Sequence, residues 1–248
     1  MSKAKAKVID YDGYDYADDF WGNGKREYED QADRLAIQRL LPKKAANFID
    51  VAGGYGRLAD EYLNRGYGKV TLFDYSKDLL NQAKKHYGAK LHTQQGDAYQ
   101  MPFQDASCDA LMMVRATHHF SDFDQVVSEI SRILKPGGIA VIELANKRTL
   151  PRVFRYWFGR SKVNPFSHDS IDITGKGFYN YHPKYAEALF AAHGLKVQKI
   201  LSVSNLRSNR LKRTFSTKFL MSIEKFSQRA LAPFRFGPSV YYQLKKVK

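Results

Sequence analysis

The sequence predicts an α/β fold in which helices cover both faces of a doubly wound, mostly parallel sheet. Two observations indicate this fold. Short apolar runs, typical of buried strands, alternate along the chain with segments of helical spacing. In addition, three successive strand-like runs are each closed by an acidic residue, and the first of them leads into a glycine turn and a helix.

The N-terminal half contains the clearest elements. A helix is expected over residues 25–41 and should end at Pro42. Residues 47–51 form an apolar run suited to a buried strand, and helical spacing follows over residues 57–65. A second strand is expected over residues 69–74. Together these elements predict one strand–turn–helix–strand unit of a parallel sheet.

The middle of the chain continues the alternation. We expect a strand over residues 110–115, a helix over 124–134 and a strand over 139–144. The Lys-Pro-Gly-Gly sequence at 135–138 should break the helix before the last of these strands. Ligands of such a sheet lie at the carboxyl ends of its strands, so the residues after 115 should face them.

The C-terminal part should supply a helix over residues 183–193 and strands over 196–204 and 239–245. Residues 205–237 separate the two strands, and their apolar residues recur at steps of three and four while basic residues take the other faces. The repeat is formed by Leu211, Phe215, Phe219, Leu220, Ile223, Phe226 and Ala230. This pattern predicts a basic amphipathic helix, which could cap the site, contact another subunit, lie on an anionic membrane or simply pack with a solvated outer face.

Glycines follow the first strand. Gly53, Gly54 and Gly56 form a tight turn, where glycine permits positive φ and a close approach of the backbone to a ligand. The spacing also satisfies the G-x-G-x-x-A pattern of dinucleotide-binding proteins, with Asp74 at the end of the second strand. The glycines alone therefore leave a nicotinamide dinucleotide and S-adenosylmethionine open.

Charge separates these two ligands. A carboxylate at Asp50, beside the turn, would repel a pyrophosphate and attract an α-ammonium or sulfonium group. Asp74 is placed to accept hydrogen bonds from ribose hydroxyls, and Asp97 to accept from an adenine amine. Each aspartate alone could be a helix cap or a turn residue, but the three together favour S-adenosylmethionine.

In these motifs the chain resembles the class I S-adenosylmethionine-dependent methyltransferases, particularly the small-molecule branch that includes ubiquinone-biosynthesis enzymes. The matching motifs are D-V-A-G-G-Y-G at 50–56, F-D-Y-S at 73–76, G-D-A-Y-Q-M-P-F at 96–103, R-A-T-H-H-F at 115–120 and L-K-P-G-G-I-A-V-I-E at 134–143. The resemblance implies a Rossmann-like, seven-stranded sheet with one antiparallel strand. Ala52 departs from the family, which more often has glycine there, so we expect negative φ at this residue.

The resemblance also implies site residues. The predicted residues for binding S-adenosyl-L-methionine are Asp50, Ala52, Gly53, Gly54, Gly56, Asp74, Tyr75, Asp97, Ala98 and Arg115. His118 and His119 are the candidates for a general base, because imidazole titrates near neutrality, although a packing role is an equal alternative for His118. Tyr99 or Arg115 are alternatives for orienting the acceptor. A metal is not expected, since no further His or Cys cluster has ligand spacing.

Segments outside the motifs complete the domain organisation. We expect a lid and helix over residues 1–46, and a methyltransferase domain over 47–248 with a substrate-side insertion at 147–182 and the basic amphipathic insertion at 205–237. The aromatic residues of the lid are Tyr11, Tyr14, Tyr16 and Trp21. They could wall the substrate pocket, with Arg26 or Tyr28 reaching the methionine carboxylate, or they could only pack the helix onto the sheet.

Composition limits the function classes. The 248 residues are 44% hydrophobic and can bury one sizeable core. A single cysteine, Cys108, excludes an internal disulfide, and we expect a packed thiol in a reducing compartment. No secretory pattern and no apolar run near the ~20 residues of a membrane span is present, so a cytoplasmic protein is expected.

Charge is distributed unevenly. The formal net charge is +15, and the stretch from 207 to 248 carries one acid, Glu224, and a net charge of +10. Such a segment favours an anionic partner, either a membrane or a nucleic acid, or is merely a solvated face. The sequence thus predicts methyl transfer to a small-molecule or lipid-like acceptor. One alternative is an RNA methyltransferase, although the chain lacks the D/N-P-P-Y/F signature of enzymes that methylate base amines. Another alternative is a non-catalytic cofactor-binding module, and the oligomeric state stays open.

Overall fold

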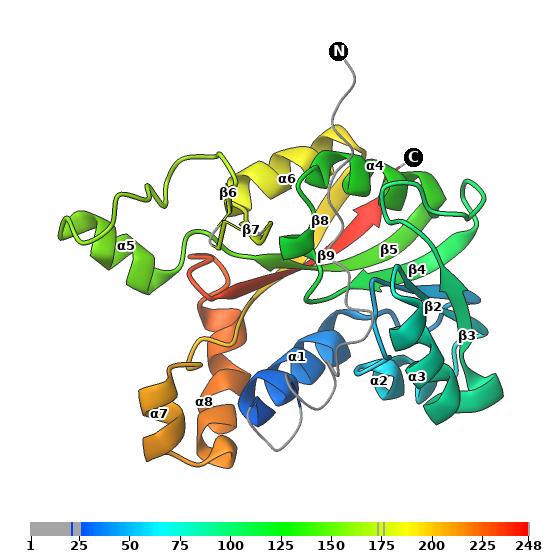
Figure 1. The fold of residues 1–248 in the computed structure, drawn as a ribbon, viewed down its shortest axis with the longest axis horizontal. Helices are drawn as coiled ribbons and strands as arrows, with labels where there is room; N and C mark the ends of the chain where they lie inside the picture. The colour runs from blue at the N-terminus through cyan, green and yellow to red at the C-terminus, as the bar shows by residue number, and fades with distance from the viewer. Residues whose placement is uncertain (1–20, 22–25, 173, 176, 248) are drawn as a thin grey trace.

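A seven-stranded sheet forms the centre of the molecule in the computed structural model, which describes residue 21 and residues 26–247 apart from 173 and 176. Its strand order is β3-β2-β1-β4-β5-β9-β8, and β9 alone runs antiparallel to its neighbours (Figure 1). The strands are β1 (Asn47–Val51), β2 (Lys69–Asp74), β3 (His92–Gln95), β4 (Cys108–Met113), β5 (Leu134–Ala145), β8 (Leu195–Val203) and β9 (Ser239–Lys246). The predicted fold class is confirmed, including the single antiparallel strand.

Helices cover both faces of this sheet. On one face lie α1 (Glu27–Leu40), α2 (Ala59–Leu63), α3 (Lys77–Tyr87) and α8 (Thr217–Ala230), and on the other lie α4 (Phe123–Ile133) and α6 (Pro183–Ala192). Strand β4 shows how the alternation of a strand separates the two cores, because Met112 packs with the first group and Leu111 and Met113 with the second. A strand buried on both faces is apolar throughout, as the sequence pattern indicated.

Several boundaries differ from the predicted ones, and three of these differences have a structural cause. Strand β4 ends at Met113 rather than at residue 115, because Arg115 has a left-handed φ of 59°. Helix α2 begins at Ala59 rather than at residue 57, since tight turns occupy the segment after Gly56. Strand β5 already begins at Leu134, which is extended and ends α4, and it passes through the Lys-Pro-Gly-Gly segment with a register shift against β4.

Residues 205–237 form two helices rather than the predicted single one. Helix α7 (Asn209–Thr214) and helix α8 are separated at Phe215, which has extended backbone angles (φ −122°, ψ 145°). Ser216 then caps α8 by accepting a hydrogen bond from the N–H of Phe219 at 3.3 Å. A serine before an apolar run favours the start of a new helix. The regular apolar spacing continues across Phe215, so it gave no sign of the break between the two helices.

Smaller elements surround the strand ends. They are the 3-10 helices η2 (Gly88–Lys90) and η3 (Thr117–His119), the helix α5 (Leu150–Trp157) and the two-stranded sheet β6 (Ile171–Asp172) and β7 (Tyr179–Asn180). Figure 1 shows α5 projecting from the body at the left of the view, on the side of the molecule away from α3. None of the helices in the described part of the chain has the length and apolar content needed to span a bilayer.

Candidate active site

The turn after β1 depends on glycine for two different reasons. Gly54 and Gly56 adopt positive φ values of 58° and 79°. Gly53 is needed for space instead, because a Cβ there would lie 2.4 Å from Leu72 Cδ1 and 2.7 Å from the carboxyl of Asp50. The turn thus combines backbone conformation and close packing, the two properties for which glycine serves in such loops.

Ala52 contradicts its predicted conformation. Its φ is 53°, so the residue that precedes the glycines is itself left-handed and carries a Cβ in that region. A left-handed conformation costs a non-glycine residue about 1–2 kcal/mol. The family preference for glycine at this position therefore has a conformational reason, and our expectation of negative φ was wrong.

The strain at Ala52 gives a prediction. We expect Ala52→Gly to raise the free energy of unfolding by up to ~1 kcal/mol, because relief of the strain exceeds the added entropy of the unfolded chain. Urea denaturation measures this change. As a control, Ala188→Gly on an exposed position of α6 should lower the free energy by about 1 kcal/mol. A loss of stability in Ala52→Gly would contradict the strain.

Two adjoining cavities lie at the carboxyl ends of the strands. The strand-end cavity is lined by Ala52, Gly54, Phe73, Asp74, Tyr75, Leu79, Gly96, Asp97, Ala98, Arg115, Ala116, His119 and Phe120. The glycine-loop cavity is lined by Trp21, Asp50, Ala52, Gly53, Gly54, Tyr55, Arg57, Leu58, Val114 and Arg115. Nine of the ten predicted cofactor residues line one or both. Gly56 is the exception, since it packs against the ring of Tyr87.

Asp74 connects β2 to the glycine turn. One of its carboxylate oxygens accepts a hydrogen bond from the N–H of Gly54 at 2.8 Å, and the other accepts from the N–H of Ser76 at 2.9 Å. Each carboxylate oxygen can accept a second hydrogen bond, so the pair remains suited to two neighbouring hydroxyls. Asp97 also lines the strand-end cavity and accepts a hydrogen bond from the N–H of Tyr99 at 2.9 Å.

Asp50 lies beneath the turn, at the glycine-loop cavity. The hydroxyl of Tyr62 donates a hydrogen bond to its Oδ2 at 3.1 Å. Burial raises the pKa of Asp50 to about 8, with the neighbouring charge of Asp74 adding to the rise and the hydrogen bond from Tyr62 opposing it. A cationic ligand group entering the cavity would favour the ionised carboxylate and lower this pKa again. Asp50 is therefore able to ionise beside a positive charge, and its role toward the cofactor stays a prediction.

A buried cluster of charges borders the same cavity and was not predicted. Asp33 of α1 is fully buried and accepts hydrogen bonds from Arg115 at 2.9 and 3.1 Å, from Arg57 at 3.0 Å and from the hydroxyl of Tyr241 at 2.8 Å. Glu143 of β5 accepts from the N–H of Arg115 at 3.1 Å. These contacts hold the guanidinium of Arg115 against the base of the cavity, although its role in cofactor binding stays a prediction.

The sequence carried one signal for this cluster. Asp33 shares a helical face with Ile37 and Leu40, at steps of four and seven, so an acid lies on the apolar side of α1. The two arginines hold the pKa of Asp33 below its ordinary range, although burial acts in the opposite direction. A buried acid on an apolar helix face requires cationic partners. Its partners in the structure are Arg57 and Arg115, and the sequence did not indicate either pairing.

The expected lid is described only in part. Tyr11, Tyr14 and Tyr16 lie outside the described residues. Trp21 lines the glycine-loop cavity, and the guanidinium of Arg57 lies 3.7 Å from the centre of its ring. Tyr28 was predicted to reach the methionine carboxylate, but it does not line the cavity. Its ring is buried, and its hydroxyl donates a hydrogen bond to Glu224 at 2.7 Å. Arg57 was not predicted as a site residue, yet its cationic side chain lines the cavity beside Arg115.

His118 and His119 form η3 after β4. Their rings lie 3.9 Å apart, and both contact the ring of Phe178, at 5.6 and 5.3 Å. Only His119 lines the strand-end cavity. Burial lowers the pKa of His119 to about 4 and lowers that of His118 well below its ordinary value, so both imidazoles are neutral at pH 7. The expectation that they titrate near neutrality is wrong for this environment.

The segment 147–182 supplies the ring above the histidines. Phe178 immediately precedes β7, and the carboxylate of Asp172 accepts hydrogen bonds from the backbone N–H groups of Gly177 and Phe178 at 2.7 and 3.2 Å. Asp172 therefore shapes the turn that places Phe178. Since this segment carries an aromatic side chain to the histidines, its position agrees with the expected substrate-side role, which stays a prediction.

Comparison with known proteins agrees with the cavity geometry. The methyltransferase domain family matches residues 49–142. The chain is 31% identical over 170 residues to a demethylmenaquinone methyltransferase of Thermus thermophilus, covering 66% of this chain and 76% of that protein. It is 26% identical to one of Desulfitobacterium hafniense and 32% identical to a ubiquinone/menaquinone biosynthesis C-methyltransferase of Hahella chejuensis. The alignments cover 55% and 48% of this chain and span only 63% and 51% of those two proteins.

Solved structures share the fold. A methyltransferase in a complex with the Haloferax volcanii Trm112 methyltransferase activator has a TM-score of 0.66 at 19% identity, over 94% of this chain and 96% of that one. An S-adenosylmethionine-dependent methyltransferase of Thermotoga maritima has a TM-score of 0.62 at 16% identity, over 93% and 96%. With its strand-end acids, its glycine turn and these relatives, the chain belongs to the class I S-adenosylmethionine-dependent methyltransferases, enzymes whose methyl donor is S-adenosyl-L-methionine.

Proposed function

We propose that this methyltransferase acts on a planar, quinol-type aromatic acceptor that binds against His119 and Phe178. The observation that supports this proposal most strongly is the set of side chains that line the strand-end cavity next to the predicted cofactor residues. There His119 and Phe120 line the strand-end cavity, and Phe178 packs on both histidines. Flat apolar walls with a single polar edge suit an aromatic ring that bears a hydroxyl group. The names of the demethylmenaquinone methyltransferases among the relatives support the same class of acceptor.

The cofactor would span the two cavities. Asp97 and Tyr75 would contact the adenine end, Asp74 the ribose, and Asp50 the α-ammonium group. The cavities meet at Ala52, Gly54 and Arg115, so the ligand would cross there without a bulky side chain from the turn. This arrangement supports the predicted role of each acid and leaves the methyl group facing η3.

The chemistry demands little of the protein beyond alignment and exclusion of water. S-adenosylmethionine supplies an activated methyl group, whose bond to sulfur breaks with the electron pair left on sulfur. The acceptor provides the pair for the new bond and loses one proton. His119 is neutral at pH 7, so it is able to accept a hydrogen bond from an acceptor hydroxyl. Its lowered pKa makes it a weak base, so it would take the proton only as methyl transfer makes that hydroxyl strongly acidic. A hydroquinone satisfies this description, whereas an oxidised quinone carbon is electrophilic.

The test uses the full chain with S-adenosylmethionine and a short-chain demethylmenaquinone, presented in reduced and oxidised form. We expect a singly methylated product, detected by mass spectrometry, from the reduced form alone. Asp74→Ala should weaken S-adenosylhomocysteine binding in calorimetry by roughly 10–100-fold, because hydrogen bonds to a charged group are lost. Asp78→Ala, an exposed acid in the first turn of α3, is the matched control and should bind normally.

Two outcomes would separate the steps of the proposal. Equal binding of S-adenosylhomocysteine to wild type and Asp74→Ala would show that the cofactor residues are misplaced. Normal cofactor binding without methylation of the quinol would leave the family intact and reject the acceptor class.

A further inference from the structure

The outward face of α8 carries a stripe of apolar side chains, in addition to the apolar Leu220 and Met221 that the helix buries. Phe219, Ile223 and Phe226 are 48%, 41% and 76% exposed. Their spacing of four and three places them in one stripe along the helix. The buried face also includes Glu224 and Gln228. The apolar stripe that the sequence predicted therefore exists, but most of it faces away from the protein.

Polar contacts explain why α8 turns this way. Glu224 is fully buried and accepts hydrogen bonds from the hydroxyl of Tyr28 at 2.7 Å and from the backbone N–H of Ser204 at 2.8 Å. Gln228 donates to the carbonyl of Ala32 at 2.9 Å. These contacts fasten α8 to α1 and β8. Packing within the described residues therefore leaves Phe219, Ile223 and Phe226 mostly uncovered.

A stripe of cations runs beside the apolar one. Each cation directly precedes an apolar residue of α8 and therefore lies beside the apolar stripe. The pairs are Lys218 with Phe219, Lys225 with Phe226 and Arg229 with Ala230. All three are exposed. None of them forms an ion pair with another residue in the described part of the chain. Their charge is therefore available to a partner outside these residues.

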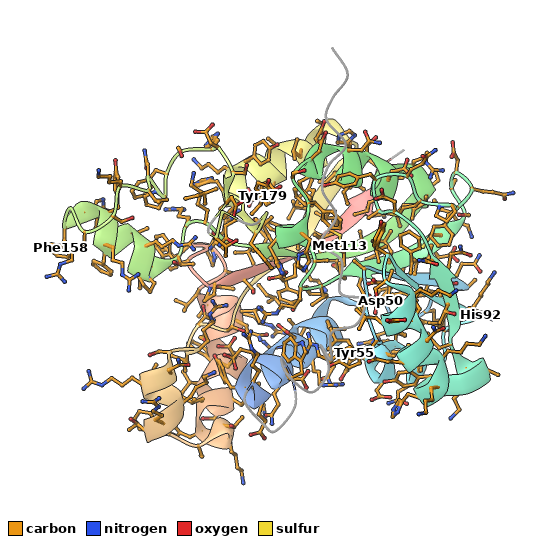
Figure 2. All side chains as sticks on the ribbon, viewed as in Figure 1. Asp50, Tyr55, His92, Met113, Phe158 and Tyr179 are labelled. Atoms are coloured by element: carbon orange, nitrogen blue, oxygen red, sulfur yellow. The ribbon has the colours of Figure 1, made fainter. Side chains whose placement is uncertain are left out.

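Helix α5 adds a second group of exposed aromatic rings. Trp157 and Phe158 are 64% and 72% exposed, and Phe154 packs against both, with ring centres 6.0 and 6.4 Å apart. Val153 is the buried residue of this helix, and Arg155 is exposed. Figure 2 shows Phe158 at the outer end of α5, far from Asp50.

The two groups of rings belong to one side of the molecule. Figure 1 shows α5, α7 and α8 on the side opposite α3. The N–H of Leu150, at the start of α5, donates to the carbonyl of Phe236 at 3.3 Å, in the segment between α8 and β9. The guanidinium of Arg148 lies over the ring of Phe236 at 4.6 Å. The base of α5 is thus joined to the chain that leaves α8.

We propose that α5 and α8 bind the surface of an anionic lipid bilayer, with their exposed rings in the headgroup region and the flanking cations on the phosphates. Exposed Phe, Ile and Trp beside Lys and Arg are the composition of helices that lie in a membrane interface. Ile223 has no ring to stack on a nucleic-acid base, and the three exposed cations oppose close packing of two copies of this face. The proposal concerns this surface and does not depend on the acceptor.

Sedimentation with vesicles tests the proposal on the full chain. We expect binding to phosphatidylcholine vesicles that contain phosphatidylglycerol, weak binding to phosphatidylcholine alone, and a decrease with added salt. Lys218→Glu with Lys225→Glu should lower the partition coefficient by roughly 20-fold or more, since two cations near the surface are reversed. Phe219→Ser with Phe226→Ser should lower it by about tenfold. Brominated lipid should quench Trp157, and the quenching should be lost in Trp157→Phe.

A matched control and a folding control accompany these variants. Lys84→Glu with Lys85→Glu reverses two exposed cations on α3, on the other side of the molecule, and should retain vesicle binding. Every variant should bind S-adenosylhomocysteine as the wild type does. The proposal is overturned if the α8 and α3 variants lose binding equally, if the Phe219→Ser and Phe226→Ser pair instead dissolves a dimer seen by sedimentation velocity, or if single-stranded RNA binds in place of vesicles.

Discussion

Asp33→Ala should lower the free energy of unfolding by about 3–5 kcal/mol, because removal of one partner leaves buried charges without compensation. The carboxylate receives four hydrogen bonds from Arg57, Arg115 and Tyr241, and it is fully buried. Urea denaturation measures the change. Since Arg57 and Arg115 border the glycine-loop cavity, binding of S-adenosylhomocysteine should weaken as well.

Asp30 provides the matched control. Asp30 also lies on α1 and forms ion pairs with Arg34 and Arg57, but its side chain is 26% exposed. Asp30→Ala should therefore lower the free energy of unfolding by less than about 1 kcal/mol. The pKa of Asp33 is lowered from its ordinary value of 3.8, so the stabilisation is present above that pH and is lost as the pH falls through the lower pKa of the folded protein. A difference between wild type and Asp33→Ala that stays under about 1 kcal/mol at pH 7 would show that the cluster does not hold the fold.

Gly53→Ala should disrupt the cofactor turn with the smallest available change. The added Cβ would lie 2.4 Å from Leu72 Cδ1 and 2.7 Å from the carboxyl of Asp50, so the turn must move. Overpacking of this kind costs about 1–3 kcal/mol, and the affinity for S-adenosylhomocysteine should fall at least ~10-fold because the bound turn carries that strain. Calorimetry measures the affinity.

Gly66→Ala separates this steric effect from ordinary glycine strain. Gly66 has a φ of 65°, and a Cβ there would meet no atom within 4 Å. The substitution should destabilise the protein by about 1–2 kcal/mol through its backbone conformation and leave cofactor affinity unchanged. If both alanine variants reduce affinity alike, the effect at Gly53 reflects general destabilisation and not the packing of the turn.

The sequence predicted the sheet, and brought together most residues that line the two strand-end cavities, because the signals for both are local. Strands β1 and β2 have the predicted bounds, since an apolar run closed by a glycine or an acid marks a buried strand and its carboxyl end. In a parallel sheet those ends meet at one edge, which brought Asp50, Asp74 and Asp97 to adjoining cavities. The bounds were least accurate where backbone conformation changes, as at Arg115 and Phe215.

The errors arose where the environment decides a property of the residue. His118 and His119 were expected to titrate near neutrality, but burial beside Phe178 lowers the pKa of both, and that ring comes from a segment far along the chain. At Ala52, the left-handed φ reflects the path from β1 into the turn. Neither the desolvation of a ring nor a backbone dihedral can be seen in the identity of a single residue.

By itself, the sequence determined the succession of strands and helices, the glycine turn and the three aspartates, because periodicity and residue chemistry act over a few positions. The methyl donor followed from the turn and the aspartates. Only the tertiary structure decided which charges meet and which faces are covered. Asp33 lies 82 positions from Arg115, and Tyr28 lies 196 positions from Glu224. The first pair completes the cluster below the cavity. The second turns the apolar stripe of α8 outward, because a buried carboxylate must keep its hydrogen-bond donors while an exposed phenylalanine has none to lose.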